Sequence, residues 1–347
     1  MGARARARTR FLAFEIRQPE ETSMKARAIK LFTGAVIAAA FTTATLAADW
    51  PKRPIRLVVP YAPGGTVDTV ARLLGDKLGT QLGQAIIIEN RPGAGGNIGT
   101  EAVTRANPDG YTLLMAGNPT HALNPHLYKE LTFDPLTDLT PIALLSLAPN
   151  LLVVNPSIGV NNVAQLVELA RNEPGVVTYS SSGRGTTGHL VGEMLKNKAD
   201  IEISHIPYRG QADAILGVIR GDVSFAAVTI PGTLAHVNDG KLKAIAITSS
   251  ERSNLAKDIP TVAESGYAGF EALAWYNLSA PPDVKPEIIK KIVGALEAVM
   301  QSPDINARFT TLGLEPRLIT GEAYTSFLKS ESEKWGTIIK QADVGGQ

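Results

Sequence analysis

Short apolar runs alternate with longer amphipathic stretches through the first third of the chain. Runs rich in β-branched residues at 55–61, 85–90 and 112–117 predict buried strands, and the stretches at 66–82 and 97–106 predict helices between them. Strands separated by helices in this way are typical of a mainly parallel sheet that is covered on both faces. The pattern therefore predicts the α/β class.

The alternation begins again after about residue 150, which favours a second domain built in the same way. A final group of helical patterns then closes the chain. The expected strands are 176–181, 203–208, 223–228 and 242–248, and the expected helices are 163–171, 186–196, 212–220, 286–300, 303–312 and 321–341.

Two long extended apolar runs, at residues 142–155 and 270–282, predict crossings between the two domains. Two crossings make the second domain an insertion into the first. We expect domain 1 to comprise residues 48–149 plus 274–347, and domain 2 to comprise residues 150–273. A cleft between two domains joined by two such strands can open and close around a ligand.

The N-terminus has the layout of a secretory signal. Basic residues precede a short apolar core at 31–41, and small residues follow up to Ala47. This core is shorter than the roughly 20 apolar residues that a membrane span needs. We place the signal at residues 24–47 and expect export to the periplasm. The residues upstream of it resemble neither a signal nor a domain, so Met1 and Met24 both stay open as the translation start.

Removal of the extension and signal, residues 1–47, changes the charge of the chain. It takes away eight basic and three acidic side chains, which leaves 26 basic and 30 acidic residues and a formal net charge of −4. The mature chain has no global basic field to attract nucleic acid. Cysteine is absent, which excludes disulfides, thiolate catalysis and a lipoprotein anchor. We expect a monomer without a cofactor.

Three glycine-rich turns stand where a predicted strand ends and a helix begins, at residues 60–66, 90–98 and 180–187. Ligands of open α/β sheets bind outside the carboxyl ends of the strands. A helix N-terminus at that edge offers unpaired N–H groups to an anion. The turns do not match nucleotide-binding fingerprints, because the third glycine of the 93–96 run falls one place late, at Gly99.

Catalytic and metal-binding patterns find no support. His121 and His126 are five residues apart and cannot share a helical face as an H-E-x-x-H pair does. Ser182 lies in a Ser-Ser-Gly sequence that lacks the leading glycine of a nucleophile elbow. We therefore predict no catalytic residue and no metal site, and we interpret the histidines as structural or surface residues. An enzyme on the same fold is the less favoured alternative.

Seven strings, which run in order along the chain from about Trp50 to the C-terminus, resemble those of the tripartite tricarboxylate transporter receptors, also called Bug proteins. The resemblance implies a two-domain periplasmic-binding-protein fold of type II, with two parallel-rich sheets joined by two crossing strands. It also implies a receptor that closes on a carboxylated solute and delivers it to membrane permease subunits. The strings are PYAPGGTVDTVARLL (60–74), ENRPGAGGNIGTEAV (89–103), PDGYTLL (108–114), SSSGRGTTGHLVGEML (180–195), HIPYRG (205–210), GDVSFA (221–226) and DIPTVAESGY (258–267).

The resemblance further implies that one ligand carboxylate is held between the first and third glycine-rich turns. Thr229 and Pro231, which follow the strand at 223–228, are expected to line the same cleft. The ligand-binding residues carried over from the family motif are Tyr61, Pro63, Gly64, Gly65, Thr66 and Asp68 in domain 1 and Ser181, Ser182, Gly183, Gly185, Thr186 and Thr187 in domain 2.

The chain departs from the family pattern at residues 211–213, where Gln-Ala-Asp replaces a neutral Ala-Pro pair. Asp213 either stabilises the N-terminus of the following helix or meets a second charged group of the ligand. Arg184 either contacts a carboxylate or is solvated. The pattern does not identify the solute, and a periplasmic sensor for a signalling partner is the alternative to a transport receptor.

Overall fold

The computed structural model of the chain describes residues 50–230 and 232–345, and its fold is carried by Pro51–Gln347. The predicted extension and signal at residues 1–47 and the predicted site residue Pro231 lie outside the described residues. Within the described part, no helix combines the length and the apolar character that a bilayer crossing requires.

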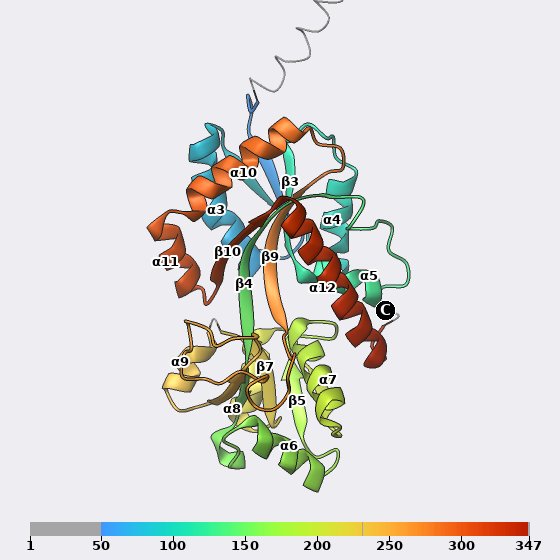
Figure 1. Ribbon diagram of the computed structural model, residues 1–347, viewed down its shortest axis with the longest axis vertical. Helices are drawn as coiled ribbons and strands as arrows, with labels where there is room; N and C mark the ends of the chain where they lie inside the picture. Colours follow the sequence, from blue (N-terminus) through green and yellow to red (C-terminus); the bar gives the residue numbers. More distant parts are fainter. Residues whose placement is uncertain (1–49, 231, 346–347) are drawn as a thin grey trace, which may run out of the picture. The chain divides into compact units, whose positions relative to one another are not determined.

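The first half of the fold is built on a mixed sheet (Figure 1). Its parallel strands β2, β1 and β3 are followed by β9, which pairs antiparallel with both β3 and β4, and β10 pairs antiparallel with β4. Burial of β1 and β3 explains why both read as apolar runs in the sequence. The strands are β1 (Ile55–Val59), β2 (Ile86–Asn90), β3 (Thr112–Gly117), β4 (Thr140–Val154), β9 (Leu273–Ala280) and β10 (Glu315–Thr320).

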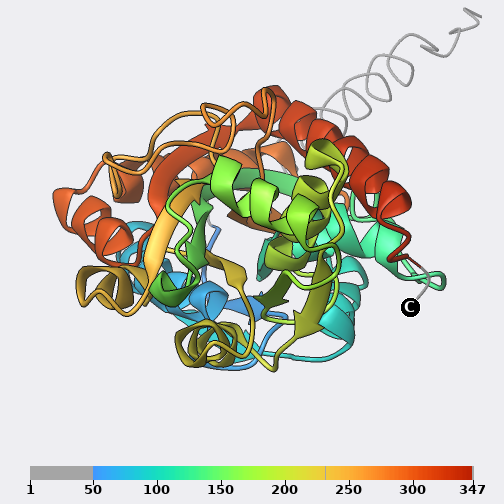
Figure 2. The same ribbon diagram turned by 90° about the horizontal axis from the view of Figure 1, so that it is seen from below.

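Helices pack on these strands from two sides. In Figure 1, α3 and α10 lie to one side, while α4 and α12 lie to the other. Figure 2 shows α12, in red, beside the turquoise segment that contains η2 and α5, which it contacts. The helices are α3 (Thr66–Leu82), α4 (Asn97–Thr104), η2 (Pro119–Leu123), α5 (Asn124–Leu127), α10 (Pro286–Met300), α11 (Pro303–Thr311) and α12 (Gly321–Gln341), with the short η1 (Ala94–Gly96) before α4.

The second half repeats the strand–helix alternation. Parallel strands β6, β5 and β7 form one side of its sheet, and both β7 and β8 pair antiparallel with the end of β4. The elements are β5 (Thr178–Ser181), β6 (Ser204–Pro207), β7 (Phe225–Thr229), β8 (Lys243–Ile247), η3 (Pro156–Ile158), α6 (Val163–Asn172), α7 (Thr187–Ala199), α8 (Gln211–Arg220) and α9 (Thr233–Asn238).

Strand β4 belongs to both halves. From Thr140 to Pro149 it pairs with β9, and from Asn150 to Val154 it pairs with β7. Figure 1 shows it running from the part that contains α3 and α10 to the part that contains α8 and α9. The crossing expected at residues 142–155 coincides with this strand. The domain limits expected from the sequence stay a prediction, because the described chain forms one compact unit.

Alternate side chains of β4 pack into apolar clusters on opposite faces of the sheet in the second half. Leu152 and Val154 belong to one apolar cluster, while Leu151 and Val153 belong to another with Val218 of α8. Successive residues of a strand point to opposite faces. An uninterrupted run of apolar residues is therefore what a strand with helices on both faces requires.

Some elements were not expected from the sequence. Strand β10 contains Pro316 and Arg317 and has no apolar run. It pairs only with β4, and its register shifts between Pro316 and Ile319. Proline is tolerated in an edge strand or at a bulge, where its missing N–H is not needed. The short helices η2 and α5 after β3 also went unpredicted, since neither is long enough to show a helical period.

Candidate ligand-binding site

The first wall of the site is the turn between β1 and α3. Gly65 is the N-cap of α3 and provides no side-chain cap. The first N–H groups of an α-helix have no partner within the helix, so this end of α3 offers donors to whatever lies in front of it. Gly65, Thr66 and Val67 line a cavity there.

Asp68 holds this turn from behind. Its carboxylate accepts a hydrogen bond from the Gly64 amide at 2.9 Å, two from Arg72 at 2.9 and 3.0 Å and one from Asn90 at 2.9 Å. The side chain of Asp68 is 5% exposed. The hydrogen bonds from Arg72, reinforced by those from Gly64 and Asn90, hold the pKa of Asp68 at about 2. The carboxylate is therefore a charged brace of the turn.

The second wall is the turn between β5 and α7, residues 182–186, termed here the SGRGT loop. Gly183 has a φ of 136° and Gly185 a φ of 71°, conformations that residues with a Cβ rarely adopt. Thr186 is the N-cap of α7 and donates a hydrogen bond from its hydroxyl to the Gly183 carbonyl at 2.7 Å. The loop thus brings the N-terminus of α7 to the same cavity, which Thr187 and Gly188 also line.

A third helix N-terminus reaches the cavity through Gln211, the first residue of α8. The side-chain carbonyl of Gln211 accepts a hydrogen bond from the Thr229 hydroxyl at 2.6 Å, and its amide donates to the Thr229 carbonyl at 3.2 Å. This pair ties the start of α8 to the end of β7. The positive ends of three helix dipoles therefore face one space, which favours a negatively charged occupant.

The cavity has a volume of about 360 Å³ and is lined from both halves of the fold. Asn118 donates a hydrogen bond to the Thr187 hydroxyl at 3.0 Å across this boundary. Tyr61 and Tyr276 form part of the wall. Burial raises the pKa of both phenols, that of Tyr276 to about 12, so both stay protonated.

Charge distinguishes one residue of the wall. Among the described residues that line the cavity, Arg184 is the single Lys, Arg, Asp or Glu. Its side chain is exposed and makes no ion pair within 4.0 Å with the described part of the chain. The lining therefore carries a positive charge that no carboxylate of the wall offsets.

Comparison with known proteins decides the family. The model of a protein family described as "Tripartite tricarboxylate transporter family receptor" matches residues 70–344. The chain belongs to this receptor family. The receptor is 33% identical over 310 residues to protein BugT of Bordetella pertussis, an alignment that covers 89% of this chain and 95% of BugT.

Solved structures agree with this assignment. A structure of an R. palustris protein with adipate matches with a TM-score of 0.77 and 32% identity, over 86% of this chain and 100% of that one. The periplasmic binding protein BugD matches with a TM-score of 0.73 and 33% identity over the same shares. The predicted fold class, a periplasmic-binding-protein fold, is therefore confirmed, and the family is one of receptors rather than enzymes.

The structure brings together part of the site expected from the sequence. Gly64, Asp68, Ser181 and Gly183 of the receptor do not line the cavity, but their hydrogen bonds organise the two turns. Pro63 and Asp213 do not line the cavity either. The expected residues that do line it are Tyr61, Gly65, Thr66, Ser182, Gly185, Thr186, Thr187 and Thr229.

Asp213 takes the third position of α8 and is exposed. A carboxylate in the first turn of a helix interacts favourably with the helix dipole. This position fits the helix-stabilising interpretation of the Gln-Ala-Asp segment. The residue of that segment that lines the cavity is Gln211.

Several residues that line the cavity were not among the site residues expected from the sequence. Asn118 directly follows β3, so the rule that ligands bind at strand ends could have identified it. Asn150 lies where β4 changes its pairing partner. Tyr276 lines the cavity whereas its neighbour Trp275 is buried and donates a hydrogen bond to Glu331 at 2.8 Å. Alternation along β9 separates the two roles. Asn124 and Tyr128, which flank α5, lie in a segment whose structure the sequence did not predict.

Proposed function

We propose that the receptor captures a small carboxylate in this cavity, in the periplasm, and delivers it to the membrane subunits of a tripartite tricarboxylate transporter. One observation carries the proposal. Helix N-termini from both halves of the fold line a single cavity whose lining, in the described part of the chain, carries one charged side chain, the cation Arg184. Backbone N–H groups at helix N-termini bind carboxylates and phosphates without needing a lysine or a metal ion.

A carboxylate is favoured over other anions by the family context. The related R. palustris structure, at 32% identity, holds adipate. The asparagine and tyrosine side chains of the wall supply further neutral hydrogen-bonding groups beside the helix N-termini. This combination suits an acid that also carries polar or apolar substituents.

The energetics require a second point of attachment. Each charge-assisted hydrogen bond to one carboxylate contributes about 1.5–3 kcal/mol. The loss of translational and rotational freedom on association costs about 4–15 kcal/mol. Capture at micromolar concentration needs about −8 kcal/mol net. A dicarboxylate, a hydroxy or keto acid, an aromatic acid or an amino acid meets this need, whereas an acid of the size of acetate binds weakly.

When the two halves close, they exclude water from the cavity. In this proposal, residues 48–149 plus 274–347 and residues 150–273 act as domains that move about β4 and its neighbour β9. Desolvation strengthens the hydrogen bonds between the helix N-termini and the ligand. The closed form then presents a new surface to the permease. Export through a cleaved signal at residues 24–47 places the receptor where it meets its solute.

A binding screen tests the proposal. Calorimetry on the mature chain against a library of mono- and dicarboxylic acids is expected to find at least one acid that binds at micromolar concentration. Thr66→Val removes a cavity hydroxyl and should weaken that acid about tenfold. Thr80→Val, on the same helix but exposed and bonded to Asp76, is the matched control and should bind like the wild type. A library without a binder, or equal affinities for the two variants, contradicts the proposal.

A further inference from the structure

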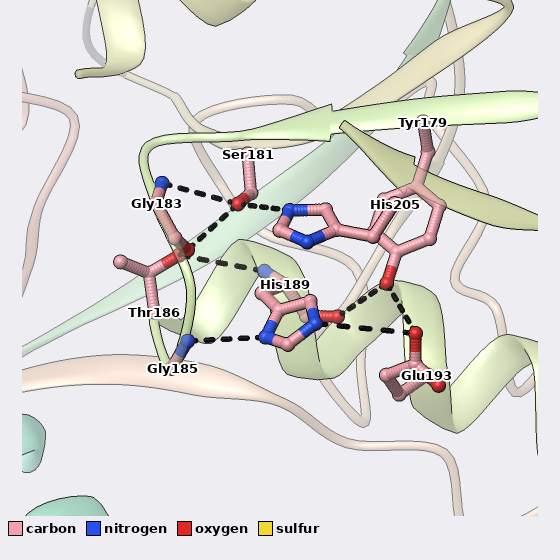
Figure 3. A network of polar contacts seen from close by, with 8 residues as sticks. All are labelled: Tyr179, Ser181, Gly183, Gly185, Thr186, His189, Glu193 and His205. Carbon is pink, nitrogen blue, oxygen red and sulfur yellow. Dashed lines mark hydrogen bonds and ion pairs between the residues drawn. The ribbon is translucent and has the colours of Figure 1, made fainter. Parts of the chain in front are cut away.

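Two histidines of the second half lie beneath the SGRGT loop (Figure 3). His189 is 2% exposed and sits in the first turn of α7, and His205 comes from β6. Their rings stack with centroids 3.9 Å apart and an interplanar angle of 27°. Neither histidine lines the cavity, so neither belongs to the ligand-binding surface described above.

His189 holds one glycine of the loop directly. The Gly185 amide donates a hydrogen bond to Nδ1 of His189 at 3.0 Å. An amide N–H can only donate, so Nδ1 must carry a lone pair rather than a proton. Protonation of the ring would place two N–H groups against each other and break this contact.

His205 holds the other glycine through Ser181. Its Nε2 lies 2.7 Å from the Ser181 hydroxyl oxygen, which accepts from the Gly183 amide at 3.2 Å and donates to the Gly183 carbonyl at 2.9 Å. A hydroxyl has one donor and two acceptor sites. All three are used when Nε2 of His205 carries a proton and donates to Ser181. Figure 3 shows both arms of this network meeting the loop.

Burial and a nearby cation favour the neutral state of the two rings, whereas one carboxylate faces His189. Burial, followed by the Arg184 cation of the loop, lowers the pKa of His189 to about 4. Burial, followed by His189 and Arg184, lowers the pKa of His205 to about 3. Glu193, on α7, is the facing carboxylate, 4.0 Å from Nε2 of His189. Its Oε1 also accepts a hydrogen bond from Tyr179 of β5 at 2.7 Å, and burial raises the pKa of that phenol, so Tyr179 stays neutral.

We propose that His189, as a neutral imidazole, and His205, as a hydrogen-bond donor to Ser181, are positioning residues that hold both glycines of the SGRGT loop in the conformation that presents the N-terminus of α7 to the ligand. This role rests on the proposed function for its consequence, the binding of a carboxylate. Its structural content, the clamping of the loop, is independent of which ligand is bound. The histidines thus act on the ligand only through the loop.

Hydrogen exchange of the loop tests the clamping of the loop separately from the binding of a carboxylate. Asparagine at position 189 can place an acceptor where Nδ1 lies and cannot be protonated, whereas leucine offers no acceptor. At pH 7, the peptide covering residues 182–187 should exchange on the order of tenfold faster in His189→Leu than in the wild type, and His189→Asn should resemble the wild type. His236→Leu, a half-buried histidine of α9 in the same half, is the control and should leave the loop unchanged.

The pH dependence of loop exchange distinguishes the clamp from a purely structural role of His189, which would not depend on protonation of its ring. The ring of His189 is bound neutral in the clamped loop, so the clamp is complete above the ordinary histidine pKa of about 6.5 and is lost as the pH falls through about 4. Loop exchange in the wild type, divided by that in His189→Asn at the same pH, should therefore rise between pH 6 and pH 4. A constant ratio, or unchanged exchange in His189→Leu at pH 7, overturns the proposal.

Adipate binding, measured on the same variants at pH 7, links the clamp to capture. Weaker binding in His189→Leu, with wild-type affinity in His189→Asn, is expected. Equal adipate affinity in His189→Leu and the wild type overturns the link to capture. If the wild type does not bind adipate while the exchange results hold, the clamp stands and the choice of ligand fails, so the two failures are distinguishable.

Discussion

Arg184 lies between the two glycines of the SGRGT loop and adds a positive side chain to a cavity wall whose other described residues are neutral. Arg209 also follows a strand of the second half and is exposed, yet it does not line the cavity. The sequence alone left the role of Arg184 open, because a loop arginine in contact with a ligand and a solvated one look the same in a sequence. The position of Arg184 at the cavity favours a role in recognising a second anionic group of the ligand.

This role predicts a charge preference. The receptor should bind a dicarboxylate found in the binding screen more tightly than the monoamide of the same acid, and Arg184→Gln should lose that preference. Because the guanidinium is exposed, the effect should be only about two- to fivefold and should shrink as salt is added. Calorimetry with both ligands measures it, and Arg209→Gln is the matched control. A preference that survives in Arg184→Gln would show that another group selects the second charge.

At the scale of single elements, strand ends and helix starts were the predictable part. The expected limits of α10 and α12 agree with the structure, because proline or glycine marks where each helix begins and an apolar stripe runs along it. The turns before α3 and α7 were found because glycine follows a buried strand in both. What the sequence could not distinguish was which residues of a turn face the ligand and which hold the turn in place.

Asp68 illustrates this difficulty. It was expected at the ligand, but its carboxylate binds the Gly64 amide and Arg72. Both interpretations place an acid near a helix N-terminus, and only the direction of the side chain separates them. His189 and His205 were interpreted as structural or surface residues. The contact of His189 with Gly185 is local, whereas the contact of His205 with Ser181 depends on β6, which is distant in the sequence.

Removal of the Asp68 carboxylate should therefore loosen the turn. Asp68→Ala leaves the Gly64 amide and Arg72 without their partner, and the free energy of unfolding should fall by about 1–3 kcal/mol. Adipate affinity should fall as well. Denaturant unfolding measures the first effect and calorimetry the second. Asp76→Ala, an exposed position on the same helix, should change stability by less than about 0.5 kcal/mol. Wild-type stability in Asp68→Ala would contradict the role of a brace.

At the scale of the whole described fold, the crossing strand β4 explains how distant segments meet. Its first part pairs with β9 and its last part pairs with β7, so the turn before α3 and the loop before α7 line the same cavity. The sequence predicted the crossing from an apolar run too long for one ordinary strand. It did not predict the mixed order of the sheet, because strand order depends on pairings between segments far apart in the chain.

In the proposed complex, backbone amides from both halves hold one carboxylate together. Titration of ¹⁵N-labelled receptor with adipate, followed by NMR, tests it at the amides of Thr66, Val67, Thr187 and Gly188. All four signals should shift and saturate with one shared dissociation constant. Shifts confined to one of the two turns, or saturation at clearly different concentrations, would contradict it.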